Sequence, residues 1–201
     1  MTVETLTRVS RWSPLASWAS RFETLPTAVG VKELPHLTQL GLRFDPAGPA
    51  AASVAAVLGT AVPTTPCTSV VAGAVTVLWL GPDEWLVVAT ADDDELLPAL
   101  TGAVSGHGAV VEVSAQRTTV SIRGPRARDL LAHGCSADLD PRISPLGTCL
   151  QTPLALAGVV LVVRDDTATD FWVLVRSSFA RYLADWVIDA CAEYAEDPSW
   201  R

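Results

Sequence analysis

The sequence predicts an α+β fold in which two similar β-α-β-β-α units are intertwined, preceded by an irregular N-terminal arm. Strand-like and helix-like patterns follow each other in the same order in both halves of the chain, which indicates an internal repeat. The stretch DEWLVVA at 83–89 is echoed by DFWVLVR at 170–176, 87 positions later. The stretches LRFDPAGPAAASVAAVLG at 42–59 and SIRGPRARDLLAHG at 121–134 each combine a strand, a Gly/Pro turn, a helix and a final glycine.

The regular patterns begin after an arm at the N-terminus. Residues 1–35 alternate Trp, Ser, Pro and Leu without a sustained period, so we expect an arm with one short helix around 15–22. We expect residues 36–201 to form one domain of two pseudo-repeats, at about 36–110 and 111–195. Because the arm carries several aromatic side chains, it must lay them on a surface of its own domain or of a neighbouring chain.

The first half contains strands and two helices. Four of its stretches alternate or are continuously apolar, as strands are: 36–44, 68–73, 74–80 and 84–89. The small residues of 49–59 predict a helix that ends at Gly59. Asp92 or Asp93 is expected to cap a helix over 95–104, because carboxylates are favourable at a helix N-terminus.

The second half repeats this order. Its strand-like stretches are 109–114, 118–124, 148–158, 159–165 and 170–176. Residues 126–133 predict a helix, with Pro125 at the first helical position and Gly134 as the C-terminal stop. The last helix is expected to start near Ser177 or Ser178. Its apolar residues recur at helical spacing, and we expect this stripe to be core: Phe179, Tyr182, Leu183, Trp186, Val187, Ala190, Cys191 and Tyr194.

The composition is unusually apolar and acidic. Apolar residues make up 49% of the chain, charged residues 18%, and there are seven Trp. These apolar side chains must be buried either in a large core or against a partner chain. Exposed apolar patches are rare on monomers, which favours a partner. The net charge of −8 opposes the binding of nucleic acid, which needs a basic surface.

The sequence favours a cytoplasmic location without a membrane anchor. Its N-terminal stretch lacks the apolar run and cleavage site of a signal peptide. The longest apolar run, 154–163, is about half of the ~20 residues that a membrane span needs. In the reducing cytoplasm we expect the cysteines to be free and buried: Cys67, Cys135, Cys149 and Cys191.

Two adjacent carboxylates are the first candidates for chemistry. Asp83 and Glu84 follow the turn at Gly81 and Pro82, so acid–base work is one interpretation and a turn feeding a strand is the other. Neighbouring strand residues point to opposite faces, and Asp-x-Trp occurs twice, so the structural interpretation is favoured. The sequence contains no phosphate-binding glycine loop, nucleophile elbow or zinc-protease motif.

The remaining polar groups have structural explanations too. The histidines lie at a strand start, between two glycines and at a helix end: His36, His107 and His133. A zinc site on His133 and Cys135 would need distant ligands, and Cys135 follows a helix, where its pKa is not depressed. The carboxylates at 92–95 suit helix capping better than a metal cage. Four arginines form either an anion site or, as we expect, a solvated surface: Arg117, Arg123, Arg126 and Arg128.

Three stretches carry a family resemblance: LGPDEWLVV at 80–88, RTTVSIRGPRARDLLAHGCSADLD at 117–140 and FWVLVRSSFARYLADWV at 171–187. They resemble the γ subunits of heterotetrameric sarcosine oxidases, over about 36–190. The resemblance implies a complex of α, β, γ and δ chains that oxidises sarcosine to glycine, passes electrons to oxygen and delivers the methyl carbon to tetrahydrofolate. It also implies that FAD, FMN, NAD, zinc and tetrahydrofolate belong to the partner subunits.

The γ chain is in turn similar to the folate-binding domains of the glycine-cleavage T-protein and of dimethylglycine oxidase, which implies a folate-binding, T-protein-like fold. Their pattern ends a strand with two acids, the second acting on folate, and later has an Asn. An ungapped alignment places Val159 and Val160 at the acids and Arg176 at the Asn. Because valine can neither take a proton nor hold a pterin amine, this copy resembles the fold without its chemistry.

We therefore expect a non-catalytic structural subunit that packs chiefly on the α subunit and has no catalytic, cofactor-binding or metal-binding residues of its own. Two alternatives stay open. The chain could be a tetrahydrofolate-binding, aminomethyltransferase-like protein acting in its own right, with the arginines from Arg117 to Arg128 on the glutamyl tail. It could also help to wall a channel for the one-carbon intermediate.

Overall fold

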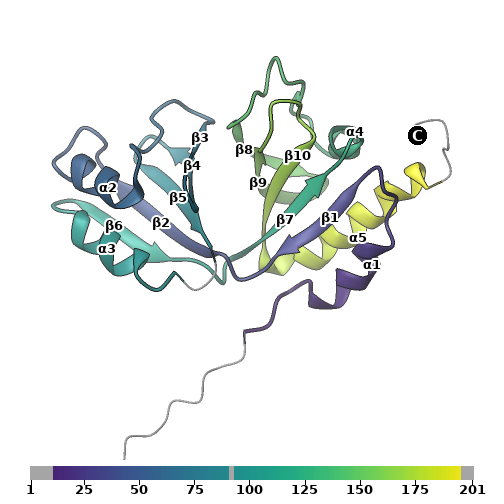
Figure 1. The fold of residues 1–201 in the computed structure, drawn as a ribbon, viewed down its shortest axis with the longest axis horizontal. Coiled ribbons are helices and arrows are strands. Elements are labelled where there is room, and N and C mark those ends of the chain that lie inside the picture. The colour runs from purple at the N-terminus through teal and green to yellow at the C-terminus, as the bar shows by residue number, and fades with distance from the viewer. Residues whose placement is uncertain (1–10, 91–92, 196–201) are drawn as a thin grey trace, which may run out of the picture.

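The computed structural model describes residues 11–90 and 93–195. Two five-stranded antiparallel sheets face each other, and helices cover the outer face of each (Figure 1). The first sheet has the order β3-β4-β5-β2-β6, with bounds Ser69–Ala72, Val75–Gly81, Glu84–Ala89, Thr38–Phe44 and Gly108–Glu112. The second has the order β1-β7-β10-β9-β8, with bounds Gly30–Leu34, Arg117–Arg123, Asp170–Arg176, Ala157–Val163 and Cys149–Leu154.

The helices are divided between the two sheets. Those on the first sheet are α2 (Ala50–Leu58) and α3 (Leu96–Ala103). Those on the second are α1 (Ala19–Glu23), α4 (Ala127–Ala132) and α5 (Ala180–Cys191). Short 3-10 turns lie before α1 and on both sides of α5, at Ala16–Trp18, Ser177–Phe179 and Ala192–Tyr194. Within the described part of the chain, no helix has the length and apolar character that a membrane crossing requires.

Three apolar clusters hold these layers together. One lies beneath the helices of each sheet, and the third lies between the sheets. The inter-sheet cluster consists of Leu78, Leu86 and Val88 from the first sheet and Cys149, Val160, Val162 and Leu174 from the second. Central strands are therefore buried on both faces, which explains why β5 and β9 are continuously apolar in sequence.

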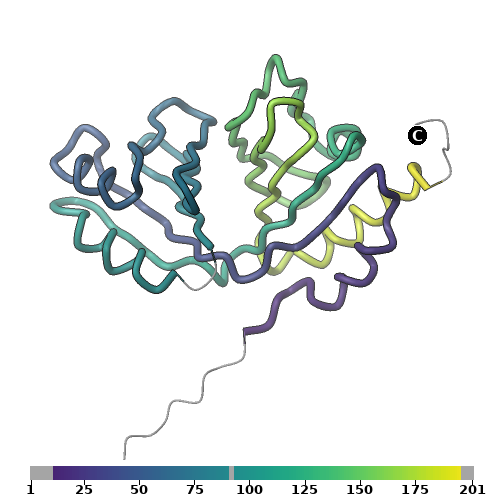
Figure 2. Tube along the Cα trace, in the orientation of Figure 1, coloured from purple at the N-terminus to yellow at the C-terminus, as the bar shows by residue number. Residues whose placement is uncertain are grey.

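Consecutive strands cross between the sheets at two places. β1 pairs with β7 in the second sheet, whereas β2, the next strand, lies in the first. β6 pairs with β2 in the first sheet, whereas β7, the next strand, lies in the second. Figure 2 shows these two connections passing each other at the lower centre. When the chain is divided between α3 and β6, each part thus contributes one strand to the sheet that the other part mainly forms.

A strand or helix is present in each predicted stretch, but the turn between β8 and β9 lies at 155–156, inside the stretch predicted as one strand. Each half also has more strands than the predicted unit. Three strands separate α2 from α3, and three separate α4 from α5, where the β-α-β-β-α formula has two. Gly59 ends α2 with φ of 71°, the left-handed C-terminal position that glycine favours. At the start of α3, the Leu96 N–H donates to Asp93 Oδ1 over 3.2 Å, whereas Asp92 lies outside the described residues.

The prediction of an irregular arm is wrong for Gly30–Leu34, which forms β1. Two charged residues, Lys32 and Glu33, obscure its alternation, and its partner β7 lies far along the chain, so local sequence carries little strand signal. Thr118 Oγ1 donates to Glu33 Oε1 over 2.6 Å. Phe22 of α1 is buried in the core of the second sheet, so the arm is part of that core.

The two Asp-x-Trp corners are not equivalent in structure. Trp85 is fully buried beneath the helices of the first sheet, whereas Trp172 packs against the inter-sheet cluster. Trp85 faces Leu42 across the strands, and the corresponding pair in the second sheet is Phe171 with Ile122. The sequence match is therefore one residue out of structural register, and such a shift turns a side chain to the opposite face.

The apolar stripe of α5 is only partly core. Phe179 and Tyr182 are 44% and 37% exposed, contrary to the prediction. The buried face of the helix is Ala180, Leu183, Ala184, Val187 and Cys191. Phe179 ends the 3-10 turn before the helix, and Tyr182 lies next to Leu183, outside the buried face.

Gly134 follows α4 without the left-handed conformation expected of a C-terminal stop. A Cβ at this position would lie 2.6 Å from the Trp186 ring and 2.9 Å from the Ala155 nitrogen. Close packing is therefore what requires glycine here. The helix itself begins at Ala127, two residues after Pro125, which is not its first position.

Replacing Gly134 with alanine is expected to destabilise the chain by about 1–3 kcal/mol, because the new methyl group overpacks against backbone and an indole ring. Chemical denaturation of the purified chain measures the change. Gly102→Ala is the matched control, since no atom lies within 4 Å of that Cβ position and alanine favours helix by up to about 1 kcal/mol. Equal stability of the two variants would contradict the assignment.

Candidate functional site

Asp83 and Glu84 lie at the turn between β4 and β5, where an arginine holds them. Arg43 Nη2 is 3.4 Å from Asp83 Oδ1 and 3.8 Å from Glu84 Oε2, and each side chain is about half exposed. The second sheet has the same arrangement, in which Arg123 Nε donates to Asp170 Oδ1 over 3.0 Å. The repeat of this ion pair at matching strand ends supports the structural interpretation of the turn.

A second carboxylate, Asp165, organises the hairpin between β9 and β10. Its Oδ1 accepts from the N–H groups of Thr169 at 2.8 Å and Asp170 at 2.9 Å, and its Oδ2 accepts from the hydroxyls of Thr167 and Thr169. Burial opposes ionisation of this acid, but the hydrogen bonds from Thr167, Thr169 and Asp170 together outweigh it and lower the pKa to about 2. The carboxylate is thus a loop anchor.

The four arginines singled out in the sequence do not converge. Arg117 and Arg123 lie at opposite ends of β7, and Arg123 is paired with Asp170. Arg126 pairs with Asp129 one helical turn away, at 2.8 Å. Because the cations are spread along a strand and a helix, they do not form one anion site.

The histidines are also separated. His133 Nε2 lies 3.2 Å from both the Tyr194 hydroxyl and Glu193 Oε2, at the end of α4. His107 borders a shallow hollow beside Asp83. Within residues 11–90 and 93–195, no group of three or more His, Cys, Asp or Glu side chains is placed to hold a metal ion.

Three cysteines are buried as predicted, but Cys67 is exposed. It lies in the loop before β3, where no apolar pattern draws it inward. Burial, and then the charge of Cys67, raises the pKa of Cys149 to about 12, and burial raises the pKa of Cys191 to about 11. Burial keeps these thiols protonated and out of reach of dissolved reagents, which agrees with a packing role in the reduced chain.

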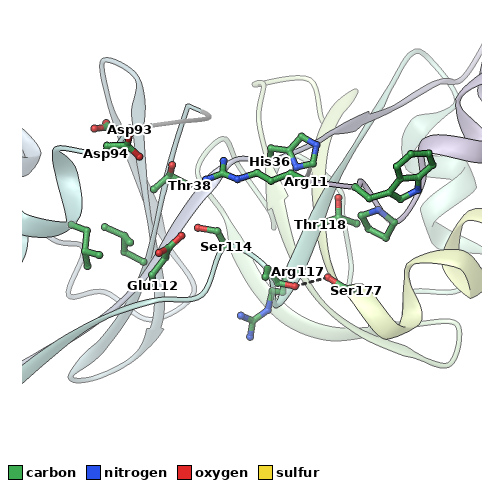
Figure 3. A pocket seen from close by; sticks show the side chains of 15 residues that line it. Arg11, His36, Thr38, Asp93, Asp94, Glu112, Ser114, Arg117, Thr118 and Ser177 are labelled. Atoms are coloured by element: carbon green, nitrogen blue, oxygen red, sulfur yellow. Dashed lines mark hydrogen bonds between the residues drawn. The ribbon is translucent and has the colours of Figure 1, made fainter. Parts of the chain in front are cut away.

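A cavity of about 430 Å³ lies where the crossing connections meet the start of α5. Figure 3 shows its polar lining: Asp93, Asp94 and Glu112 on the side of the first sheet, Thr118 and Ser177 on the side of the second, and Arg11 and His36 between them. The Ser177 hydroxyl donates to the Ala115 carbonyl over 2.9 Å, so it supports the backbone. The cavity offers charges of both signs to a small polar molecule. Separate segments build it, so no sequence window predicted it.

The positions aligned with the folate-binding acids are part of the hydrophobic core. Val159 is 5% exposed and packs beneath the helices of the second sheet, while Val160 is 4% exposed and packs between the sheets. Arg176, aligned with the Asn, lies at the exposed end of β10. The two valines point to opposite faces of β9, and neither lines the polar cavity. These residues do not fit folate bound as the T-protein pattern would bind it.

A model of the sarcosine oxidase, gamma subunit family matches residues 43–193. The chain belongs to this family. Two relatives named sarcosine oxidase subunit gamma come from Corynebacterium sp. strains P-1 and U-96. The P-1 relative is 36% identical over 85% of this chain and 83% of its own length, and the U-96 relative is 37% identical over 92% of each. The resemblance predicted from the sequence is therefore confirmed.

Solved structures agree with the family at the level of fold. A chain of the heterotetrameric sarcosine oxidase from Corynebacterium sp. U-96, in complex with pyrrole 2-carboxylate, superposes with a TM-score of 0.86 at 33% identity, covering 93% of this chain and 97% of that one. The glycine cleavage system aminomethyltransferase T from Bartonella henselae gives a TM-score of 0.58 at 15% identity, covering 85% and 48%. This second likeness concerns the fold alone and confirms its T-protein-like character.

The substitution Val160→Asp places an acid where the T-protein pattern has one. It is expected to destabilise the chain by about 3 kcal/mol or more without creating affinity for folate, because the carboxylate would be buried among apolar side chains. Denaturation curves measure the loss. Val71→Asp, on the edge strand β3 at a site 53% exposed, should cost less than about 1 kcal/mol. A stable, folate-binding Val160→Asp variant would refute this account of the position.

Asp165→Asn tests the loop anchor through pH. The pKa of Asp165 lies below the ordinary value of 3.8, so its stabilising effect is complete above about pH 4 and is lost as the pH falls toward 2. The wild-type chain should therefore be more stable than the variant at neutral pH, and the difference should shrink on acidification. Thermal unfolding between pH 7 and pH 2.5 measures it, with Asp166→Asn, at the exposed neighbouring residue, as control. A difference independent of pH would contradict the prediction.

Proposed function

We propose that the chain is a non-catalytic structural subunit of a heterotetrameric sarcosine oxidase and packs chiefly on the α subunit. It supports oxidative demethylation of sarcosine to glycine, with the one-carbon unit passing to tetrahydrofolate. Family membership and the likeness to a chain of the U-96 heterotetramer support the proposal. The observation that carries it is Val160, which is buried between the sheets where the folate-binding pattern has an acid.

Exposed apolar side chains around α5 support contact with a partner. Leu156, in the turn between β8 and β9, is 81% exposed. Phe179, at the end of the 3-10 turn before α5, and Tyr182, in the first turn of α5, are partly exposed too. The Leu156 N–H donates to the Tyr182 hydroxyl over 3.2 Å, which fixes these two residues beside each other. Aromatic residues are enriched at the cores of protein interfaces, so a partner that covers them would account for the apolar surplus of the chain.

The proposal assigns the cofactors to the other chains. The α, β and δ subunits hold FAD, FMN, NAD, zinc and tetrahydrofolate, and this chain contributes packing surface. The location is the cytoplasm, as predicted from the sequence.

A second candidate is a tetrahydrofolate-binding, aminomethyltransferase-like protein acting in its own right. One observation favours it, the polar cavity of about 430 Å³ lined by Asp93, Asp94 and Glu112 together with Arg11. Carboxylates can bind the amino groups of a pterin and a guanidinium can bind a glutamyl tail, so the cavity has suitable groups for a folate. The burial of Val160 outside this cavity is the reason for ranking it second.

Titration calorimetry with tetrahydrofolate distinguishes the two functions. The purified chain is expected to show no saturable heat with micromolar ligand, because the aligned acids are buried valines. The assembled oxidase is the positive control, since the proposal places folate in a partner subunit. Saturable binding to the chain alone, abolished by Glu112→Gln in the cavity, would favour the second candidate instead.

A further inference from the structure

The two halves of the chain also meet through a short ladder away from the crossing strands. Thr68, before β3, and Thr148, before β8, form an isolated antiparallel bridge. The Ser69 N–H donates to the Gly147 carbonyl over 2.7 Å on one side of it. Figure 1 shows β3 and β8 side by side at the top of the molecule, opposite the crossing connections at the bottom. The ladder therefore joins the two sheets at the end opposite the crossing connections.

This ladder places two cysteines opposite each other. Thr68 faces Thr148 in an antiparallel bridge. Cys67, which precedes Thr68, therefore lies opposite Cys149, which follows Thr148. The Cys149 N–H donates to the Cys67 carbonyl over 2.8 Å. This direct backbone hydrogen bond brings the two Cα atoms within the separation of about 4.4–6.8 Å that a disulfide spans.

The two thiols differ in access to solvent. Cys67 is exposed, and its φ of 60° places it in a loop rather than in a regular strand. Cys149 is 1% exposed, and its Sγ lies 3.8 Å from the Trp79 carbonyl. A dissolved oxidant can therefore reach Cys67, whereas Cys149 is shielded from solvent.

We propose that Cys67 and Cys149 are a redox modification site, at which hydrogen peroxide converts the thiol pair into a disulfide between the two halves. The Cys67 thiolate attacks one peroxide oxygen, the O–O bond breaks, and Cys67 becomes a sulfenic acid while the departing hydroxide takes a proton to form water. The Cys149 sulfur then attacks the Cys67 sulfur, the S–O bond breaks, and the hydroxide leaves with the Cys149 proton as a second water. Two thiols and one peroxide thus give one disulfide and two waters.

The source of the peroxide rests on the proposed function. An oxidase that passes two electrons from an amine to oxygen produces hydrogen peroxide at its own site. A subunit of that complex is therefore exposed to the oxidant at the moment of its formation. The disulfide would join residues 82 positions apart and reduce the freedom of the unfolded chain, which stabilises the folded state.

The test uses the native complex, treated with graded hydrogen peroxide, capped with N-ethylmaleimide and digested without reductant. Mass spectrometry is expected to find a peptide that links Cys67 to Cys149, lighter than the two thiol peptides by two hydrogen atoms and released by dithiothreitol. Thermal unfolding should shift upward by about 5 °C or more on oxidation. Cys67→Ser, at an exposed site, should abolish both effects, and Cys135→Ser should leave both unchanged.

Several results would contradict the proposed disulfide. Cys67 found as sulfinic or sulfonic acid, or capped while Cys149 stays a thiol, would overturn the proposal, as would a disulfide to Cys135 or Cys191. Because the peroxide is added, the result does not depend on the chain's role in an oxidase. Failure of the chain to copurify with the other subunits would refute the proposed function, and the purified chain then takes the same peroxide test.

Discussion

β1 lies in the second sheet although the strands that follow it, β2 to β5, form the first, and β6 lies in the first sheet although β7 to β10 form the second. This exchange of strands joins two similar halves into one body. Neither sheet is complete without a strand from the other half, so neither half is expected to fold by itself. The exchange also fixes which faces meet, because the connections cross at one end and leave the central strands of both sheets opposed. The inter-sheet cluster, the polar cavity beside the crossing and the cysteine ladder at the far end all depend on this arrangement.

The crossing concentrates polar groups near one end of the interface. Gln39 of β2 is 1% exposed, and its Nε2 donates to the Arg117 carbonyl at the start of β7 over 3.0 Å. This bond ties the first sheet to the second where their chains exchange. Leu86, Val160 and Leu174 of the inter-sheet cluster are apolar residues between the same two sheets. The interface thus combines directional hydrogen bonds with apolar burial.

Features that depend on neighbouring residues in the chain were predicted from the sequence. Alternation and apolar runs located the strands, and Gly59 marked the end of α2 because only backbone conformation decides that position. Long-range features escaped prediction. β1 is a strand because β7 lies beside it, Phe179 is exposed because it ends the 3-10 turn before α5, outside the buried face of the helix, and the cavity is assembled from separate segments. The repeated Asp-x-Trp pattern suggested equivalent corners, but Trp85 corresponds in strand register to Phe171 and not to Trp172.

Comparison of the two halves distinguishes residues that stabilise the fold from the residues that folate chemistry would require. The pair of Arg43 with Glu84 recurs as Arg123 with Asp170 at matching cross-strand positions, so the fold itself uses this ion pair twice. With valine at 160 the position contributes apolar burial, about 1.5–3 kcal/mol for a fully buried side chain, where an acid would need a partner. The same residue therefore stabilises the joint between the sheets and removes the group that would act on folate.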